Sequence, residues 1–188
     1  MAGERDPARR EDLQRIIDSA LTGREVVKRL MYSSCEMPSQ FREQDLNTVV
    51  EGVLRLLRRQ VDEARLELRT DLATPLPPVR LDRVQFEQVL TNLVLNAVAA
   101  TPPGGRLHIA TDVADGRVQL RVSDTGHGIA AEHLRKIFQP FFTTEPPGVG
   151  TGLGLSVVHG IIKGHGGDIR VESAPGEGAT FIITLPAA

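Results

Sequence analysis

The sequence contains few of the features that mark secreted, membrane-spanning or nucleic-acid-binding proteins. Among its 188 residues there is a single cysteine, Cys35, which excludes an internal disulfide and any multi-cysteine zinc site. No apolar run approaches membrane-spanning length, and the charged residues 1–10 are not followed by the apolar core of a signal peptide. The net charge of −2 includes no strongly basic tract, which argues against a nucleic-acid-binding surface. We therefore expect a cytoplasmic chain with no nucleic-acid or membrane contact of its own, and leave open a membrane anchor elsewhere in a parent protein.

The first part of the chain has the pattern of an amphipathic helix. Apolar residues recur at helical spacing between residues 13 and 31, and Leu13, Ala20 and Val27 fall seven residues apart. Such a stripe needs a partner helix, so a homodimer through this helix is left open. Pro38 and the polar residues after it predict the end of the helix. We expect residues 1–44 to form this helical segment and residues 45–188 to form a second domain.

The second domain begins with helical patterns. A helix is predicted from residues 45–47 to about Ala64, and further helices are predicted from about Asp82, near Glu132 and after Gly152. In the first of these helices the apolar side is formed by Val49, Val53, Leu56, Leu57 and Val61. In the helix from Asp82 the core-facing stripe is formed by Phe86, Leu90, Leu93 and Ala97.

Between and after these helices the sequence has strand patterns. Strands are predicted at residues 66–70, 107–113, 117–122, 168–172 and 180–185. Turn residues at 114–116 and 175–178 predict two hairpins. We expect a two-layer α/β sandwich, in which helices cover one face of a mixed sheet.

Four short motifs follow one another in this domain. They are NLVLNA at residues 92–97, DTGHG at 124–128, FQPFFTT at 138–144 and GTGLGL at 150–155. Each motif is common by chance, but all four within about sixty residues, each in a suitable structural context, indicate a nucleotide-binding site.

The first motif places two asparagines on one helix. Asn92 and Asn96 are four residues apart, so both project from the same side of the helix. An amide carbonyl is a hard, neutral oxygen ligand, which suits a Mg²⁺ ion that takes its other ligands from water and phosphates. The alternative, two exposed helix asparagines, would cost a little helix propensity for no gain.

The second motif places a carboxylate at the end of a predicted strand. Asp124 can accept a hydrogen bond from an exocyclic amine such as that of adenine. Gly126 and Gly128 would let the backbone and the base approach each other closely. Read alone, Asp-x-Gly is also a very common turn sequence.

The last two motifs enclose a segment rich in proline and glycine. Gly148, Gly150, Gly152 and Gly154 fall within seven residues and precede an apolar helix, so backbone N–H groups can converge on phosphate oxygens at the start of that helix. We expect the segment between the motifs to be a mobile lid. Three aromatic residues are expected to attach it to the domain: Phe138, Phe141 and Phe142.

Together the four motifs resemble the N, G1, F and G2 boxes of sensor histidine kinases, in the wider superfamily that includes gyrase, Hsp90 and MutL. The resemblance extends from about Leu46 to Pro186. It implies a Bergerat-type ATP-binding fold and makes residues 45–188 a catalytic ATP-binding domain. It also implies that residues 1–44 are part of a dimerisation hairpin whose other helix, with the acceptor histidine, is absent.

The resemblance assigns roles to single residues. It implies that Asn96 is the Mg²⁺ ligand and that Asn92 supports the metal–phosphate site. It makes Asp124 the adenine anchor, with Thr180 as a second polar contact beside it. Further ATP contacts are implied for residues in or next to the boxes: Gly126, Gly128, Ile129, Thr143, Gly150, Thr151, Gly152, Leu153, Gly154 and Leu155.

The resemblance further implies a protein histidine kinase that binds Mg–ATP. The γ-phosphoryl group would pass to a histidine on a dimerisation helix and then to the receiver domain of a response regulator. Two alternatives stay open: a non-catalytic nucleotide-binding regulatory module, and a serine kinase or ATPase of the same superfamily.

Two positions depart from the patterns of these families. Asn92 stands where hydrolytic relatives have a glutamate that activates water, so we expect slow hydrolysis and a kinase rather than an ATPase. Glu145 stands where kinases with a similar lid usually have a lysine, which weakens the expectation of efficient transfer but not of binding.

The histidines decide whether the chain can label itself. An acceptor histidine of the family lies on a helix and is typically followed by an acidic residue and then a proline. None of the five histidines has this context: His108, His127, His133, His159 and His165. We expect structural or surface roles for all five, and a chain that is either a truncated form or acts on another molecule.

Overall fold

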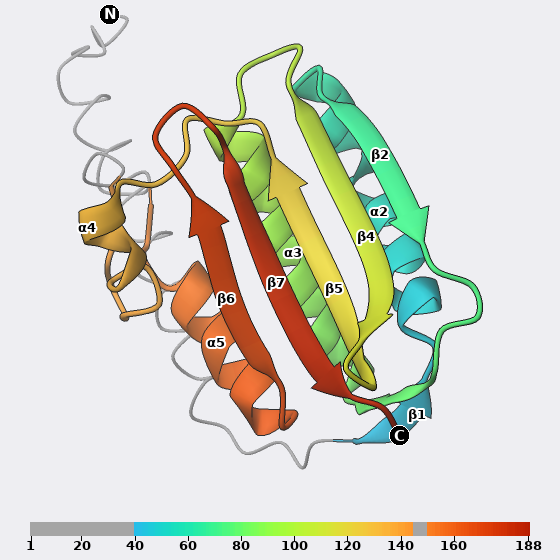
Figure 1. The fold of residues 1–188 in the computed structure, drawn as a ribbon. Coiled ribbons are helices and arrows are strands. Elements are labelled where there is room, and N and C mark those ends of the chain that lie inside the picture. The colour runs from blue at the N-terminus through green and yellow to red at the C-terminus, as the bar shows by residue number, and fades with distance from the viewer. Residues whose placement is uncertain (1–39, 145–149) are drawn as a thin grey trace, which may run out of the picture. The chain divides into compact units, whose positions relative to one another are not determined.

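The computed structural model of the protein describes residues 40–144 and 150–188 (Figure 1). The amphipathic helix expected before Pro38, and Glu145 in the expected lid, lie outside the described residues. By its internal contacts the chain divides into two compact units, one of which consists of Ser39–Phe142 and Gly152–Ala188. This unit is an α/β domain.

The α/β unit is built on a five-stranded sheet. Its strands are β2 (Glu67–Leu72), β4 (Arg106–Ala114), β5 (Arg117–Asp124), β6 (Asp168–Ser173) and β7 (Ala179–Pro186), in the order β2-β4-β5-β7-β6. β2 runs parallel to β4, and every other neighbouring pair is antiparallel. The predicted mixed sheet and both predicted hairpins are therefore confirmed.

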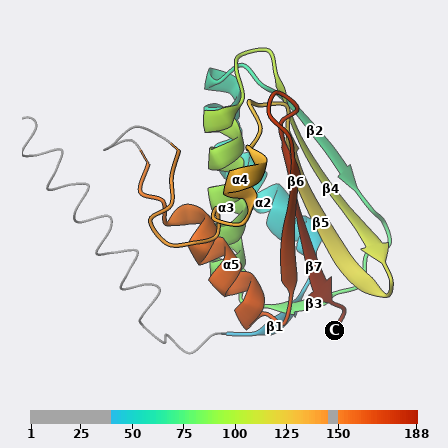
Figure 2. The same ribbon diagram turned by 60° about the vertical axis from the view of Figure 1, so that its left-hand side comes forward.

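Three helices lie on one face of this sheet, as Figure 2 shows. They are α2 (Leu46–Glu63), α3 (Arg83–Ala100) and α5 (Gly154–Gly164). A fourth, short helix, α4 (Ala131–Leu134), follows the loop after β5. The two-layer α/β sandwich expected from the sequence is confirmed.

Aspartate residues begin the two long helices. Asp45 Oδ1 accepts the N–H of Asn47 at 2.9 Å, and Asp82 Oδ1 accepts the N–H of Gln85 at 3.1 Å. Each carboxylate satisfies a backbone donor that has no partner within the first helical turn. Both predicted helix starts are thus explained by capping.

The predicted apolar side of α2 is wrong at one position. Leu56 is 75% exposed, whereas Leu54, which was not predicted, is buried. At 100° per residue Leu56 lies about 200° around the helix from Leu54, so the two cannot face the sheet together. The other four predicted positions are buried: Val49, Val53, Leu57 and Val61.

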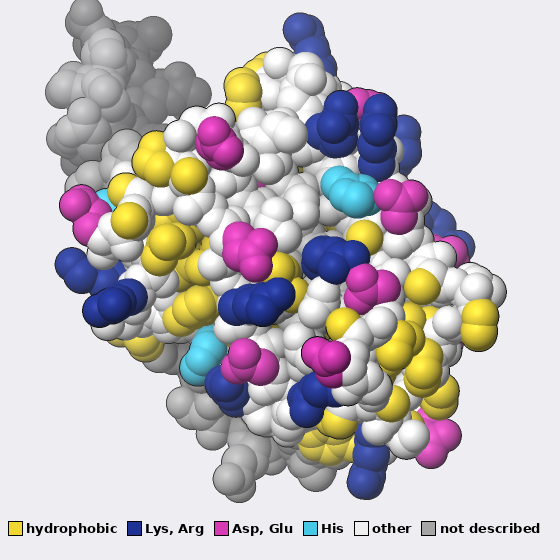
Figure 3. Space-filling view, in the orientation of Figure 1, with side chains coloured by type: hydrophobic (Ala, Val, Ile, Leu, Met, Phe, Trp, Pro, Cys, Tyr) yellow, Lys and Arg dark blue, Asp and Glu magenta, His cyan; other side chains and the backbone are white. Residues whose placement is uncertain are grey.

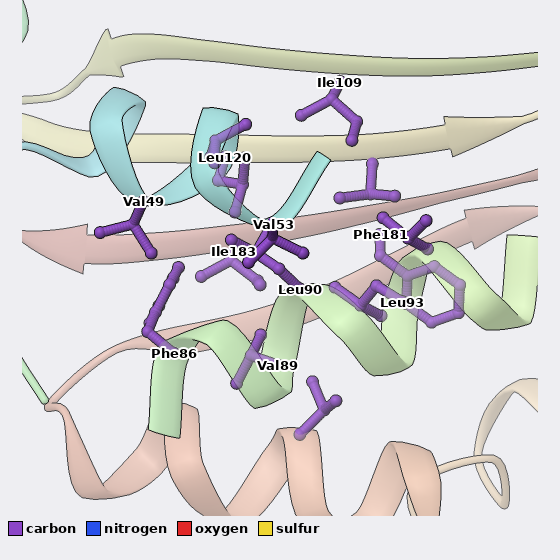
Figure 4. Packing of buried hydrophobic residues seen from close by; sticks show 14 of the residues in the cluster. Val49, Val53, Phe86, Val89, Leu90, Leu93, Ile109, Leu120, Phe181 and Ile183 are labelled. Carbon is purple, nitrogen blue, oxygen red and sulfur yellow. The ribbon is translucent and has the colours of Figure 1, made fainter. Parts of the chain in front are cut away.

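The core lies between these helices and the sheet. Phe86, Leu90 and Leu93 of α3 point towards the strands, where Phe181 and Ile183 of β7 are also buried (Figure 4). The predicted stripe of α3 is confirmed, since Ala97 is buried too. Each fully buried aliphatic or aromatic side chain contributes roughly 1.5–3 kcal/mol of hydrophobic free energy. This packing fixes α3 against the sheet.

A second, two-stranded sheet was not predicted. In it β1 (Arg42–Gln44) pairs antiparallel with β3 (Val79–Leu81). The backbone N–H of Ala188 donates to the carbonyl of Pro78 at 2.9 Å, so the C-terminus lies beside β3. Residues 42–44, which the sequence placed in the N-terminal segment, are thus hydrogen-bonded to the α/β unit. Their run of polar residues, Arg-Glu-Gln, has no apolar alternation that would identify a strand.

The face of the sheet opposite the helices is rich in charge, as Figure 3 shows. Arg106 Nε lies 3.2 Å from Glu67 Oε2, and Arg121 pairs with Asp112. Exposed pairs of this kind contribute at most about 1 kcal/mol each, so this face is open to water rather than part of the core. Within residues 40–144 and 150–188, none of the helices combines the length and apolar composition of a membrane span.

Candidate functional site

Asp124 is the one buried carboxylate among the described residues. It ends β5 on the face that the helices cover and is 9% exposed. Its Oδ1 accepts the backbone N–H of Gly126 at 2.8 Å and that of Ala179 at 3.3 Å. Oδ2 accepts no hydrogen bond from the described residues. One oxygen therefore holds the loop, and the other can accept a hydrogen bond from a ligand.

Burial controls the acidity of this carboxyl. Desolvation raises the pKa of Asp124 above its ordinary value, and the N–H groups of Gly126 and Ala179 act in the opposite direction. Among the described residues, Oδ2 of Asp124 is not one of the fully buried atoms that lack a partner, so this oxygen is accessible to water or to a ligand. A carboxyl whose pKa is shifted by burial is a candidate functional group.

The two glycines after Asp124 allow the loop to pack closely. A Cβ atom on Gly126 would lie 2.5 Å from the carbonyl oxygen of Ala100, at the end of α3. Gly128 has φ +70°, and a Cβ atom there would collide with the carbonyl of Ala174. The loop therefore depends on glycine at both positions because it packs against other parts of the backbone, and the close approach to a base that the sequence predicted for these glycines remains a prediction.

Thr180 does not lie beside Asp124. In the register of β5 and β7, Asp124 faces Ala179, whereas Thr180 faces Ser123. Successive side chains of a strand point to opposite faces, so Thr180 lies on the face of the sheet away from Asp124. There its Oγ1 donates to Ser123 Oγ at 3.0 Å. The expected contact of Thr180 is thus corrected: the side chain next to Asp124 is that of Ala179.

Asn92 lies beside the start of α5. A Cβ atom on Gly154 would be 3.7 Å from Asn92 Oδ1, which is ordinary van der Waals contact. Asn92 is half-buried, and Asn96, one turn further along α3, is exposed. The structure therefore brings one of the two predicted asparagines next to the predicted glycine-rich helix start.

The start of α5 has the chemistry of an anion site. Its N-cap residue is Leu153, whose side chain has no oxygen to accept the N–H groups of the first turn. The N-terminus of an eleven-residue helix carries a partial positive charge, and its free N–H groups can bind phosphate oxygens. Leu153 is 4% exposed and Leu155 packs against the core, so both anchor this turn.

A Mg²⁺ ion fits this part of the site only if a ligand supplies most of its coordination. Among the described residues there is no cluster of three or more His, Cys, Asp or Glu side chains that could hold a metal. The amide oxygens of Asn92 and Asn96 are hard, neutral donors on accessible positions of α3. That donor set suits Mg²⁺ carried by phosphates and water rather than a fully protein-enclosed metal.

Aromatic residues flank the expected lid. The ring of Phe138 lies 5.4 Å from that of His159, and the ring of Phe142 lies 5.4 Å from that of His133. Phe141 is 62% exposed, with φ +66°, so its predicted role in attaching the lid is wrong. The Phe141 backbone contacts Gly152, whose φ of +62° and close approach require glycine.

Three predicted ATP contacts lie in the other compact unit of the chain. Thr143, Gly150 and Thr151 belong to it, and their part in the site remains a prediction. Ile129 lies in the α/β unit and packs against the core.

All five histidines lie in the described residues, and each has a local contact. The contacts are a carboxylate for His108, a backbone carbonyl for His127, the ring of Phe142 for His133, the ring of Phe138 for His159, and two backbone groups for His165. These contacts agree with the structural roles expected from the sequence.

Comparisons with known proteins find histidine kinases and the family to which they belong. Residues 81–188 match the family described as "Histidine kinase-, DNA gyrase B-, and HSP90-like ATPase". The chain is 38% identical over 182 residues to the signal transduction histidine-protein kinase AtoS of Escherichia coli K12, which covers 96% of this chain and 30% of AtoS. It is 41% identical over 142 residues to the sensor histidine kinase ZraS of the same bacterium, which covers 76% of this chain and 30% of ZraS. The chain thus spans about 30% of the length of these two relatives.

Solved structures with the same fold include histidine kinases. The nucleotide-free catalytic domain of ThkA has a TM-score of 0.71 and 35% identity, with 79% of this chain and 96% of that chain covered. Full-length ShkA in complex with AMPPNP has a TM-score of 0.79 and 26% identity, with 100% of this chain and 40% of that chain covered. ThkA in complex with the response regulator protein TrrA has a TM-score of 0.79 and 31% identity, with 98% and 53% covered.

Proposed function

The chain belongs to the histidine kinase-, DNA gyrase B- and HSP90-like ATPase family, with sensor histidine kinases among its relatives, and we propose that it binds Mg–ATP for phosphotransfer to a histidine in two-component signalling. The observation that carries the proposal is the buried carboxylate of Asp124, which has one oxygen bound in its loop and one oxygen left to accept.

Asp124 would recognise the base. The exocyclic amine of adenine is a donor, and Oδ2 of Asp124, which accepts no hydrogen bond from the described residues, can accept one from it. Gly126 brings the backbone of the loop close to this carboxylate, since a Cβ atom there would lie 2.8 Å from Asp124 Oδ1. The carboxylate therefore favours a base that presents an amine over one that presents a carbonyl oxygen.

The phosphates would lie at the start of α5. Backbone N–H groups of its first turn and the helix dipole favour a triphosphate there. Asn92, which lies beside Gly154, and Asn96 are the residues that we propose to hold the nucleotide-bound Mg²⁺. When bound, the ion would offset the negative charge of the phosphates.

The chain itself would supply position and charge rather than a nucleophile. Asn92 has no useful basicity, so it cannot activate water for attack on the γ-phosphorus. A histidine nitrogen on a separate helix would attack instead, the bond from the γ-phosphorus to the bridging oxygen would break, and ADP would leave. A receiver domain of a response regulator is the proposed next acceptor, as the complex of ThkA with TrrA suggests by analogy.

A second candidate function is a nucleotide-binding module without phosphotransfer. Two observations favour it: every histidine has a local contact in the described residues, and Glu145 stands where a lysine is usual. A serine kinase or an ATPase of the superfamily is a third candidate, and Asn92 argues against the ATPase.

One experiment separates these functions. The full chain is first titrated with a non-hydrolysable ATP analogue, with and without Mg²⁺, by calorimetry. It is then incubated with γ-labelled ATP, alone and with a purified acceptor-histidine hairpin from a related kinase. We expect Mg²⁺-dependent binding, no label on the chain alone, little released phosphate, and acid-labile label on the hairpin.

Each other outcome has a distinct meaning. Absence of nucleotide binding would overturn the proposal at its base. Binding without transfer to the hairpin would favour the non-catalytic module, and rapid release of phosphate would favour an ATPase. Acid-labile label on the chain alone would identify an acceptor within it, for which His127, His133 and His159 would be substituted next.

A further inference from the structure

Ser173 is the last residue of β6 and bonds to two other parts of the backbone through its side chain. Its Oγ accepts the N–H of Ile129 at 2.8 Å and donates to the carbonyl of Gly178 at 2.6 Å. A hydroxyl has one hydrogen, so the donor and acceptor roles of this group are both defined. Ser173 thus connects the end of the Asp124 loop with the turn between β6 and β7.

That turn supports the loop at several points. Figure 1 shows the loop after β5 passing beside the β6–β7 turn at one end of the sheet. Gly176 donates its N–H to the carbonyl of His127 at 2.8 Å, and the backbone of Gly178 lies against that of Asp124. On its other side the loop is held by the N–H of His127, which donates to Ala100 at 3.2 Å.

Among these contacts, Ser173 differs in that its side chain bonds to both the loop and the turn. The other bonds between the loop and the turn join backbone to backbone or involve Asp124 itself. Ser173 Oγ joins Ile129, at the far end of the loop, to Gly178, whose backbone contacts Asp124 at the near end. Both ends of the loop are therefore positioned by contacts with the same part of the turn, at Gly178. Loss of the hydroxyl would leave Ile129 N–H and the Gly178 carbonyl without this partner.

We propose that Ser173 is a positioning residue for recognition of the purine base, acting through the loop from Asp124 to Ile129 rather than by touching the ligand. The inference rests on the proposed function, and it adds a determinant of base selectivity outside the four motifs. Since both hydrogen-bonding roles of the hydroxyl are used within the protein, it has no donor left for a nucleotide. Its effect is to hold the free oxygen of Asp124 and the side chain of Ile129 in one arrangement.

The test compares three variants of the full chain. Ser173→Ala removes the hydroxyl, and Ser173→Thr retains it. Ser123→Ala is the matched control, because Ser123 is also a strand serine next to the site but bonds to Thr180 on the opposite face of the sheet. For each variant, Kd is measured with non-hydrolysable analogues of ATP and of GTP in the presence of Mg²⁺, together with the temperature of unfolding.

We expect Ser173→Ala to raise Kd for the ATP analogue about tenfold and to reduce the preference for ATP over GTP, because loss of one hydrogen-bonding group in such a network typically costs about one factor of ten. Ser173→Thr should restore both values, and Ser123→Ala should leave both unchanged. If Ser173→Ala does not fold, Ser173→Cys, which keeps the side-chain volume with much weaker hydrogen bonding, replaces it and should show the same change of preference.

A purely structural role predicts a different result. In that case Ser173→Ala would lower the unfolding temperature while Kd and the preference for ATP over GTP stayed at the wild-type values, which would overturn this inference. Failure of the wild-type chain to bind either nucleotide is distinguishable from this result, and it would overturn the proposed function itself.

Discussion

The backbone N–H of Asp82 donates a hydrogen bond of 3.0 Å to Nε2 of His165, so the start of α3 is joined to the end of α5. An amide nitrogen can only donate, which means that Nε2 carries no proton and that Nδ1 does. Nδ1 then donates to the carbonyl of Ile161 at 2.7 Å. The ring also lies 4.8 Å from that of Phe41, just before β1. The buried imidazole of His165 therefore connects α3 and α5. The proposed site uses Asn92 and Asn96 of α3 and the N-terminus of α5.

His165→Ala should destabilise the fold by about 2–4 kcal/mol, because it removes a buried ring and leaves the Asp82 N–H without its acceptor. Urea unfolding followed by circular dichroism measures this loss. The matched control is His108→Ala, which removes a partly exposed ring whose Nε2 lies 2.7 Å from Asp71 Oδ2. There we expect at most about 1 kcal/mol, the usual upper limit for a surface pair. Equal losses in the two variants would show that His165 does not join the helices in the way described.

Gly128→Ala should lower the stability of the fold by more than the strain of its positive φ alone explains. Gly128 and Gly116 have nearly the same φ, +70° and +71°, but a Cβ atom would collide with Ala174 at the first position and meet nothing within 4 Å at the second. The strain of positive φ costs about 1–2 kcal/mol in both variants, and the collision adds to it only at Gly128. Thermal unfolding with and without an ATP analogue measures both effects. Similar losses for Gly128→Ala and Gly116→Ala would mean that the loop can move aside.

Asn96→Ala should weaken triphosphate binding only when Mg²⁺ is present. We expect a loss of about tenfold, or about 1.4 kcal/mol, for the ATP analogue with Mg²⁺, and little change for AMP. Asn92→Ala should act in the same direction, because its side chain lies next to Gly154 at the start of α5. Gln88→Ala, one turn earlier on α3, is the control amide. A loss of equal size in EDTA would exclude a metal role for Asn96.

The helices and hairpins could be predicted because local signals and packing agree. Asp45 and Asp82 are capping residues in the sequence and cap the helices in the structure. Asp124 stands at the end of a predicted strand, and strand ends at the covered face are where a carboxylate can be buried. At Asp124, the residue that ends the strand is also part of the candidate site.

The positions that were missed depend on information that is not local. Phe181, Ile182 and Ile183 form an unbroken apolar run, so period-two alternation cannot tell which face Thr180 takes, and only the register with β5 places it opposite Ser123. Ser173 precedes a Pro-Gly turn, so the sequence indicates only a turn residue. Its bond to Ile129 depends on the packing of two loops that are distant in the sequence, and this packing also defines its role at Gly178. Such contacts come from tertiary structure.

Asp124→Asn should separate stability from nucleotide binding. Burial raises the pKa of Asp124, so the folded state penalises its ionised form. The stability linked to this group is complete below the ordinary aspartate pKa and is lost as the pH rises through the raised pKa of the folded state. Asparagine is never ionised, and its Oδ1 can still accept the N–H groups of Gly126 and Ala179. At neutral pH the variant should therefore be at least as stable as the wild type, with a difference that shrinks as the pH falls.

Nucleotide binding should change in the other direction. In the variant an amide N–H group replaces the free acceptor oxygen and faces the donor amine of adenine, which should raise Kd for the ATP analogue at least about tenfold and favour guanine, whose carbonyl oxygen accepts. Calorimetry with both analogues, and unfolding as a function of pH, measure the two effects. Asp168→Asn is the control of opposite sign, because the hydrogen bond from Lys163 lowers the pKa of Asp168, so its stability is lost as the pH falls rather than as it rises. If Asp124→Asn bound ATP as the wild type does, the carboxylate would be a structural part of the loop, and the adenine would have to bind elsewhere.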